Sequence, residues 1–317
     1  MAVGALPPAG PTATAGPLPA RRPPRRAGWR RRWPLAPALL WLVVLTQLPF
    51  VFTVLFSFQS RNLLRPGAER WVGLANYANV FTDTVFRAAL LTEIELTVLA
   101  VAIAMALGTA LALLLDRRFP GRGVARTLLI SPFLVMPAVA GLLWKTAMFD
   151  PVFGLVNVAA SWAGVQGTDF TSRFPVASVV TVLVWQWTPF MMLIVLAGLR
   201  SQPADTLEAA RVDGAGPWAT FRWITLPYLR RYIELGVLLG VIHLVNTFDV
   251  IYMMTQGGPG TRTTNLPYYI YQRAFLGFDV GQSSALGVVT VAGTLVAAAL
   301  ALRLLFTAFT GVRAGDR

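Results

Sequence analysis

Five long runs of uncharged, mostly apolar residues restrict this chain more than any other feature of its sequence. They cover residues 33–60, 96–115, 127–144, 174–199 and 280–302. A helix rises ~1.5 Å per residue and needs ~20 apolar residues to cross ~30 Å of hydrocarbon, and each run is near or above that length. Because a backbone in lipid must satisfy its own hydrogen bonds, these runs predict an all-α integral membrane protein.

A sixth membrane-spanning helix is predicted over 233–256, although Asp249 interrupts its apolar character. Arg230 and Arg231 precede this segment, and the sequence Gln-Gly-Gly-Pro-Gly at 256–260 ends it, which is a basic entry and a helix-stopping exit. Without this span the two long connecting loops would fall on the wrong sides of the membrane. The expected fold is therefore six transmembrane helices within residues 34–312.

The arginines indicate that both termini lie in the cytoplasm. With six spans and a cytoplasmic N-terminus, the segments on the cytoplasmic side contain 19 arginines, whereas those on the outer side contain 7. Lys and Arg concentrate in the cytoplasmic loops of membrane proteins, so this asymmetry supports that orientation. A cleaved signal peptide is the alternative for the first run, but its length and the lack of a clear small-residue cleavage site favour a retained helix.

Both ends of the chain are predicted to be cytoplasmic tails. Residues 1–20 are rich in Ala, Pro and Gly, and 21–33 contain seven arginines, a composition that cannot bury a core. We therefore expect a disordered, Arg-rich tail over 1–33 and a short tail over 313–317. The net charge of +13 could suggest nucleic acid, but the arginines lie at the ends of apolar runs, so no nucleic-acid partner is predicted.

The chain has few residues that could carry out chemistry. It has no cysteine, one histidine, His243, and one lysine, Lys145. Lys145 follows Trp144 rather than a glycine-rich turn, so it cannot serve a Walker-type phosphate loop. A lone histidine cannot build a histidine-based zinc site or a facial triad. We therefore predict no catalytic residue, no metal site and no cofactor in this chain.

The predicted cytoplasmic loop between the fourth and fifth spans carries a motif. It reads Glu208-Ala209-Ala210, three residues, Gly214, nine residues, and then Ile224-x-Leu226-Pro227. Pro203 suits the first turn of a helix, Gly214 frees the backbone to turn, and Pro217 can start a second short helix. Leu207, Ala209 and Ala210 can then face a partner. This predicts a helix-turn-helix over 203–227, with a solvated amphipathic linker as the alternative.

This motif closely resembles the cytoplasmic coupling loop of binding-protein-dependent ABC importer permeases. Two further segments, 71–77 and 248–259, resemble the carbohydrate-uptake branch of that family, which includes the maltose-type and glycerol-phosphate-type permeases. The resemblance implies a permease subunit that moves a sugar or polyol across the cytoplasmic (inner) membrane of a prokaryote. A secondary transporter and an integral-membrane enzyme are the alternatives. Secondary transporters usually show internal repeats and intramembrane carboxylate relays, so six spans with one obvious buried acid, Asp249, fit the first alternative poorly.

The resemblance also implies partners. They are a second permease in a heterodimer, two ATP-binding subunits that bind ATP and Mg, and an extracytoplasmic solute-binding protein. In similar proteins this loop docks on the ATPase, which gives the following coupling residues: Glu208, Ala209, Ala210, Asp213, Gly214, Phe221, Leu226 and Pro227.

Polar and aromatic residues within the spans suggest where a solute could pass. Pro189 and two neighbouring tryptophans lie inside the fourth span, where a broken hydrogen-bond ladder needs a neighbour or a cavity, and sugars stack on aromatic rings. Asn246 and Asp249, three residues apart and expected on one helical face, are costly in hydrocarbon. The predicted solute pathway consists of Trp185, Gln186, Trp187, Asn246 and Asp249. The alternatives are interface anchoring or packing for the tryptophans and a structural polar contact for the other pair.

Overall fold

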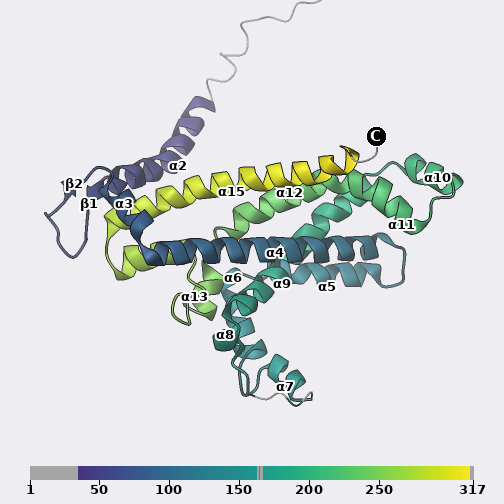
Figure 1. Cartoon of the computed structure of the whole chain (residues 1–317), viewed down its shortest axis with the longest axis horizontal. Helices are drawn as coiled ribbons and strands as arrows, with labels where there is room; N and C mark the ends of the chain where they lie inside the picture. The colour runs from purple at the N-terminus through teal and green to yellow at the C-terminus, as the bar shows by residue number, and fades with distance from the viewer. Residues whose placement is uncertain (1–34, 163, 165–166, 315–317) are drawn as a thin grey trace, which may run out of the picture. The chain divides into compact units, whose positions relative to one another are not determined.

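A computed structural model of the chain describes residues 35–162, 164 and 167–314 (Figure 1). The predicted tail at 1–33 lies outside these residues, and so does the end of the predicted tail at 313–317. The chain divides into two compact units, residues 1–50 and 51–317. The described part of the first unit is mainly the beginning of helix α2 (Ala36–Ser57), and the other elements belong to the second unit.

The second unit is mostly helical and contains one short β-hairpin. Strands β1 (Gln59–Ser60) and β2 (Arg70–Trp71) pair antiparallel, with Gln59 opposite Trp71. The longer helices are α4 (Thr84–Asp116), α5 (Arg122–Leu134), α9 (Pro175–Arg200), α12 (Leu226–Leu244) and α15 (Val280–Ala314). The shorter helices are α3 (Ala75–Thr82), α6 (Pro137–Leu143), α7 (Leu155–Ser161), α8 (Phe170–Arg173), α10 (Ala204–Val212), α11 (Pro217–Thr220), α13 (Asp249–Met254) and α14 (Leu266–Tyr271), and the π-helical turns are η2 (Trp144–Met148), η3 (Phe221–Thr225) and η4 (Gln272–Leu276).

Several helices are suited to cross a membrane. Within the described residues, α2, α4, α9 and the part of α15 over Val280–Arg303 are long and apolar enough. A fifth span results if α5 and the α6–η2 segment are taken as one helix bent by 99°. The segment expected as a single span at 233–256 is instead divided between α12 and α13. The count of six spans therefore stays a prediction.

Helix α4 is longer than the apolar run that indicated it. It begins at Thr84 rather than near 96, because the helix continues through Glu93 and Glu95, whose charges kept that region out of the run. Glu93 is only 4% exposed, and its Oε2 accepts a hydrogen bond from the backbone amide of Leu266 at 3.1 Å. The sequence did not indicate Glu93 as a buried acid, whereas Asp249, the acid that it did single out, is exposed in the single chain.

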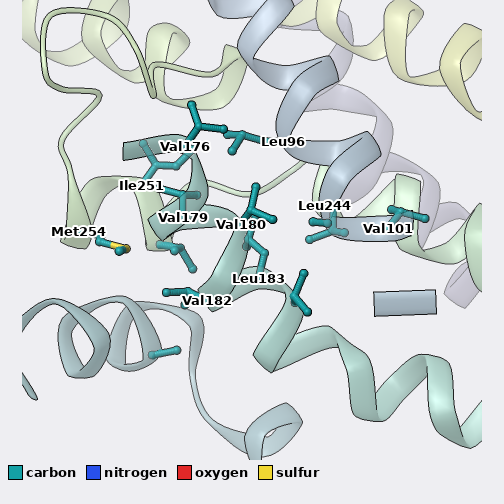
Figure 2. Close-up of a cluster of buried hydrophobic side chains, with 14 of the residues drawn as sticks. Leu96, Val101, Val176, Val179, Val180, Val182, Leu183, Leu244, Ile251 and Met254 are labelled. Carbon is teal, nitrogen blue, oxygen red and sulfur yellow. The ribbon is translucent and has the colours of Figure 1, made fainter. Parts of the chain in front are cut away.

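Helix α9 lies at the centre of the bundle and packs against α4, α5 and α12 (Figure 1). Figure 2 shows one of its apolar clusters, in which valines and Leu183 of α9 gather with residues of α4, α12 and α13. A second cluster surrounds Met191 and Met192 of α9. There α4 approaches so closely at Gly108 that a Cβ atom would lie 2.8 Å from both the Cβ of Met191 and the amide nitrogen of Met192. The contact between α4 and α9 therefore depends on the absence of a side chain at Gly108.

Two helical segments are broken, and each break leaves a carbonyl that needs a donor. Between α5 and α6 the backbone is extended at Val135, and the side-chain amide of Gln186 donates to the Val135 carbonyl at 2.7 Å. Between α12 and α13 the side-chain amide of Asn265 donates to the Thr247 carbonyl at 2.6 Å. A buried carbonyl without a partner costs a few kcal/mol, so both amides stabilise the breaks. The second break also separates Asn246 from Asp249, so they do not share a helical face as expected.

A charged cluster joins the beginning of α4 to α14 and η4. Asp83, the N-cap of α4, accepts hydrogen bonds from the Tyr269 hydroxyl and, at 2.7 Å, from the Arg273 guanidinium. Burial by itself would raise the pKa of Asp83, but the hydrogen bonds from Tyr269, the Val85 amide and Arg273 together outweigh burial, and the pKa lies below its usual value. The folded state therefore favours the ionised carboxylate.

We predict that this cluster stabilises the protein in a pH-dependent way. A depressed pKa adds stability that is fully present above the unfolded-state value of ~3.9 and is lost as the pH falls below that value towards the lower folded-state pKa. Asp83→Asn removes the charge but keeps a good N-cap, so at pH 7 it should lower the thermal midpoint in detergent by about 2–4 °C. The difference from the wild type should shrink as the pH falls below about 4.

The exposed carboxyl of Glu69 supplies the control for that measurement. Glu69→Gln should leave the midpoint unchanged at pH 7. An Asp83→Asn midpoint equal to that of the wild type at pH 7, or a difference that grows as the pH falls, would contradict the stabilising role of the Asp83 charge.

Candidate functional site

The motif at 203–227 folds as two short helices joined by a tight turn. Helix α10 ends at Val212, and Gly214 follows with a φ of +79°, a conformation that side chains other than glycine rarely adopt. The Ala215 amide donates to the Ala210 carbonyl at 2.9 Å and the Gly214 amide to the Arg211 carbonyl at 3.1 Å. These two bonds form a Schellman motif, which closes the C-terminus of α10. Helix α11 then begins at Pro217, as the sequence predicted.

The faces of α10 differ from the prediction at one residue. Glu208 and Ala209 are exposed, and Asp213 is the exposed C-cap. Ala210 is only 5% exposed, so its side chain faces the rest of the chain and not a partner, contrary to the expectation. Glu208 lies beyond the first turn of α10, which begins at Ala204.

The other predicted coupling residues lie at the base of the helix pair. Phe221 is half-buried and its ring lies 5.8 Å from that of Trp218. Leu226 is half-buried and packs on the cluster around Met191, whereas Pro227 is exposed in the first turn of α12. These residues attach the helix pair to the bundle.

Three exposed apolar residues near this turn were not predicted. Val212 is 87% exposed, Trp218 is 74% exposed, and Trp223 is also exposed. Beside them the ends of α4 and α9, together with α10 and α11, form a hollow of about 830 Å³ that Leu207, Trp218 and Phe221 help to line. The tryptophans are a signal that the sequence offered, because two such rings in a predicted aqueous loop are unusual. An exposed apolar patch of this kind favours a protein partner.

The residues of the predicted solute pathway do not converge on one point. Trp185 packs against Trp144 with ring centroids 5.7 Å apart, on the α6–η2 side of α9. Trp187 lies on another face of α9, 5.1 Å from the His243 ring of α12. Gln186 is buried and bonded to Val135, so its amide supports the backbone.

A group of rings that the sequence left unassigned surrounds Trp187. Phe133 of α5 and Phe190 of α9 each lie 5.7 Å from Trp187, and their own rings are stacked at 5.4 Å. The Nδ1–H of His243 donates to the Leu239 carbonyl oxygen of its own helix at 2.8 Å. Asn246 and Asp249 follow on the α12–α13 connection, and both are exposed in the chain. Trp187 and Asn246 therefore flank the same part of α12.

The acidic side chains and the single histidine are spread out over the described part of the chain. Among those residues, no group of three or more His, Cys, Asp or Glu side chains lies close enough together to hold a metal ion.

Residues 122–311 match the family described as "Binding-protein-dependent transport system inner membrane component". The chain is 36% identical to the probable ABC transporter permease protein y4oQ of Sinorhizobium fredii, over 84% of this chain and 87% of the relative. It is 34% identical to the sulfoquinovosyl glycerol transport system permease protein SmoG of Agrobacterium fabrum, over 86% and 89%. It is 32% identical to the trehalose transport system permease protein SugA of Mycobacterium tuberculosis, over 87% and 89%.

A solved structure shows the same fold. It is a chain of a bacterial ABC transporter involved in the import of the acidic polysaccharide alginate, with a TM-score of 0.75 and 22% identity, over 87% of this chain and 96% of that chain. The family supplies the membrane component of a transport system rather than an enzyme. This chain belongs to the family of binding-protein-dependent transport system inner membrane components, and is a multi-pass ABC importer permease.

Proposed function

We propose that the chain passes a sugar or polyol through the membrane when partner ATPases press on the α10–α11 helix pair. The observation that carries this proposal is the complete motif, folded as two helices around Gly214 with Glu208 and Ala209 exposed. Two of the relatives are named for sulfoquinovosyl glycerol and trehalose, which supports a carbohydrate as solute.

The proposed assembly contains two permeases, this chain and a similar one, with two ATP-binding subunits and an extracytoplasmic solute-binding protein. ATP and Mg bind to the ATP-binding subunits, since this chain has no phosphate loop of its own. A structure similar to this chain is that of the alginate transporter in complex with a pentasaccharide-bound periplasmic protein, which supports the binding protein as a partner.

Within the motif the residues have three proposed roles. Glu208, Ala209 and Asp213 form the face that meets the ATPase, with Val212 and Trp218 adding apolar area beside it. Gly214 and Ala210 shape the helix pair, the first through its positive φ and the second by packing inward. Phe221, Leu226 and Pro227 join the pair to α12.

We predict that changes in the turn and on the open face remove ATPase binding. Gly214→Val strains the positive φ, and Ala209→Arg places a large charged group at the proposed contact. Each should reduce co-purification of the ATP-binding subunits by ~10-fold or more while the chain still reaches the membrane.

The control for the backbone change is Gly67→Val. Gly67 has a φ of +85°, and a Cβ atom added there would meet no atom within 4 Å, as at Gly214, but Gly67 lies in the β-hairpin loop. Ala209→Ser tests size at the other position and should keep ATPase binding. Normal co-purification of the ATP-binding subunits with both Gly214→Val and Ala209→Arg would contradict the proposed contact.

The proposed topology has six spans with both termini in the cytoplasm. The chain lacks cysteine, so a single cysteine at the exposed Ala204 of α10 can be labelled without background. We expect a membrane-impermeant maleimide to label Ala204→Cys only after the inner face is opened, and to label a cysteine at Glu69 in intact cells. Labelling of Ala204→Cys in intact cells would show that the orientation is opposite to the proposed one.

The proposed solute pathway runs along the exposed connection between α12 and α13, past Trp187, Asn246 and Asp249, with Trp185 and Gln186 supporting α9 behind it. Polar groups at membrane depth need water or the bundle interior, which favours these positions. Asn246→Leu and Asp249→Leu should each lower uptake ~5-fold or more with normal co-purification of the ATPase. Uptake is measured with the sugar that the wild type imports fastest from a panel headed by trehalose and maltose. Wild-type uptake by both variants would exclude these two residues from the pathway.

A further inference from the structure

A cluster of four polar and aromatic side chains closes the base of the motif loop. It consists of Ser201, the C-cap of α9, together with Tyr228, Arg231 and Tyr232 of α12, and we call it the tyrosine clamp. The Ser201 hydroxyl lies 2.6 Å from the Tyr232 hydroxyl and 3.1 Å from the Tyr228 hydroxyl, and the Tyr228 hydroxyl donates to the Ser201 carbonyl at 2.7 Å. Both ends of the segment that holds α10 and α11 are therefore bonded to each other.

Arg231 holds the two rings of the tyrosine clamp in place. Its guanidinium carbon lies 4.9 Å from the centre of the Tyr228 ring and 5.0 Å from that of Tyr232. One of its terminal nitrogens also donates to the Tyr228 hydroxyl at 2.9 Å. A cation over a ring face and a charge-assisted hydrogen bond both favour one ring orientation. The rings are thereby oriented toward Ser201.

The helices beneath the clamp meet at a glycine. A Cβ atom on Gly198 of α9 would lie 2.7 Å from the ring of Tyr232 and 2.8 Å from a methyl group of Leu229, which is fully buried. The ring of Tyr232 thus rests directly on the backbone of α9. Packing and hydrogen bonding fix the distance between α9 and α12 at the same level.

The position of the clamp gives it a mechanical consequence. The segment that holds α10 and α11 leaves α9 after Ser201 and rejoins the bundle at α12. If the two ends of this segment could separate, a force on α10 would only move the ends apart and would not reach α9 and α12. With the ends bonded, the same push moves α9 and α12 together.

We propose that Ser201, Tyr228, Arg231 and Tyr232 are positioning residues that transmit movement of α10 and α11 to α9 and α12 as one rigid body. The helices that would move are α9, which carries Trp187, and α12, which ends just before Asn246. This inference rests on the proposed function, because it needs an ATPase that presses on α10. It assigns no contact with the ATPase or the solute to the clamp itself.

The test measures movement of α12 in the assembled transporter, reconstituted with its second permease and ATP-binding subunits. The probe is a single cysteine at the exposed His243 of α12, labelled with a water-soluble maleimide without nucleotide and with MgATP and vanadate. In the otherwise wild-type chain the two labelling rates should differ by ~5-fold or more. The double change Tyr228→Phe and Tyr232→Phe keeps both rings and removes both hydroxyls, and should bring the ratio of rates close to one with unchanged co-purification of the ATPase.

Two further variants separate the clamp from a general loss of structure. Gly198→Ala keeps every hydroxyl but displaces the Tyr232 ring, and should reduce the ratio in the same way. Tyr77→Phe is the matched control, because the Tyr77 hydroxyl lies 2.7 Å from the Ser57 hydroxyl, away from the clamp, and its loss should leave the ratio unchanged.

The outcomes are distinct. The proposed role of the clamp would be contradicted if the double variant kept the wild-type ratio of labelling rates. It would also be contradicted if that ratio were near one in the otherwise wild-type chain. Loss of ATPase co-purification in the double variant would also overturn it, because the tyrosines would then belong to the docking surface. Failure of the proposed function is seen separately, as normal ATPase binding by Gly214→Val and Ala209→Arg.

Discussion

The hydrogen-bonding demand of the backbone in lipid is the constraint on which this structure depends. Helices satisfy it along most of the bundle, but two segments are broken, at Val135 and at Thr247. Amide side chains from other elements, Gln186 and Asn265, donate to the carbonyls at these points. Each break is possible only because a donor from elsewhere in the fold reaches it. Sequence-distant residues thereby decide where the helices end.

The second break also leaves polar residues exposed beside an otherwise apolar bundle. Ending α12 at Leu244 frees a short connection that holds Asn246, while the rings of Trp187 and His243 pack beside it. At the other end of α9 and α12, Gly214 ends α10 and leaves a small exposed helix face. Helices α9 and α12 therefore connect the proposed solute pathway with the proposed ATPase contact.

The sequence predicted the features that depend on local pattern. It did not predict those that depend on tertiary contacts. Apolar length located α9 and α15, and glycine and proline spacing located the turn at Gly214. Because of its charge, Glu93 was left out of the predicted apolar run. Its burial in α4 is possible because its carboxylate accepts a hydrogen bond from the backbone amide of Leu266. The inward face of Ala210 and the bond from Gln186 to Val135 are tertiary contacts, which no periodicity within one segment encodes.

The exposed rings beside the turn have a consequence for how such a subunit is produced. Trp218 and Val212 are largely uncovered in the single chain, and apolar side chains in water favour association with whatever surface is nearest. A copy synthesised in excess of its partners would therefore aggregate or be degraded by quality-control proteases. Balanced expression of all subunits, rather than the folding of this one, then sets how much intact transporter a cell accumulates.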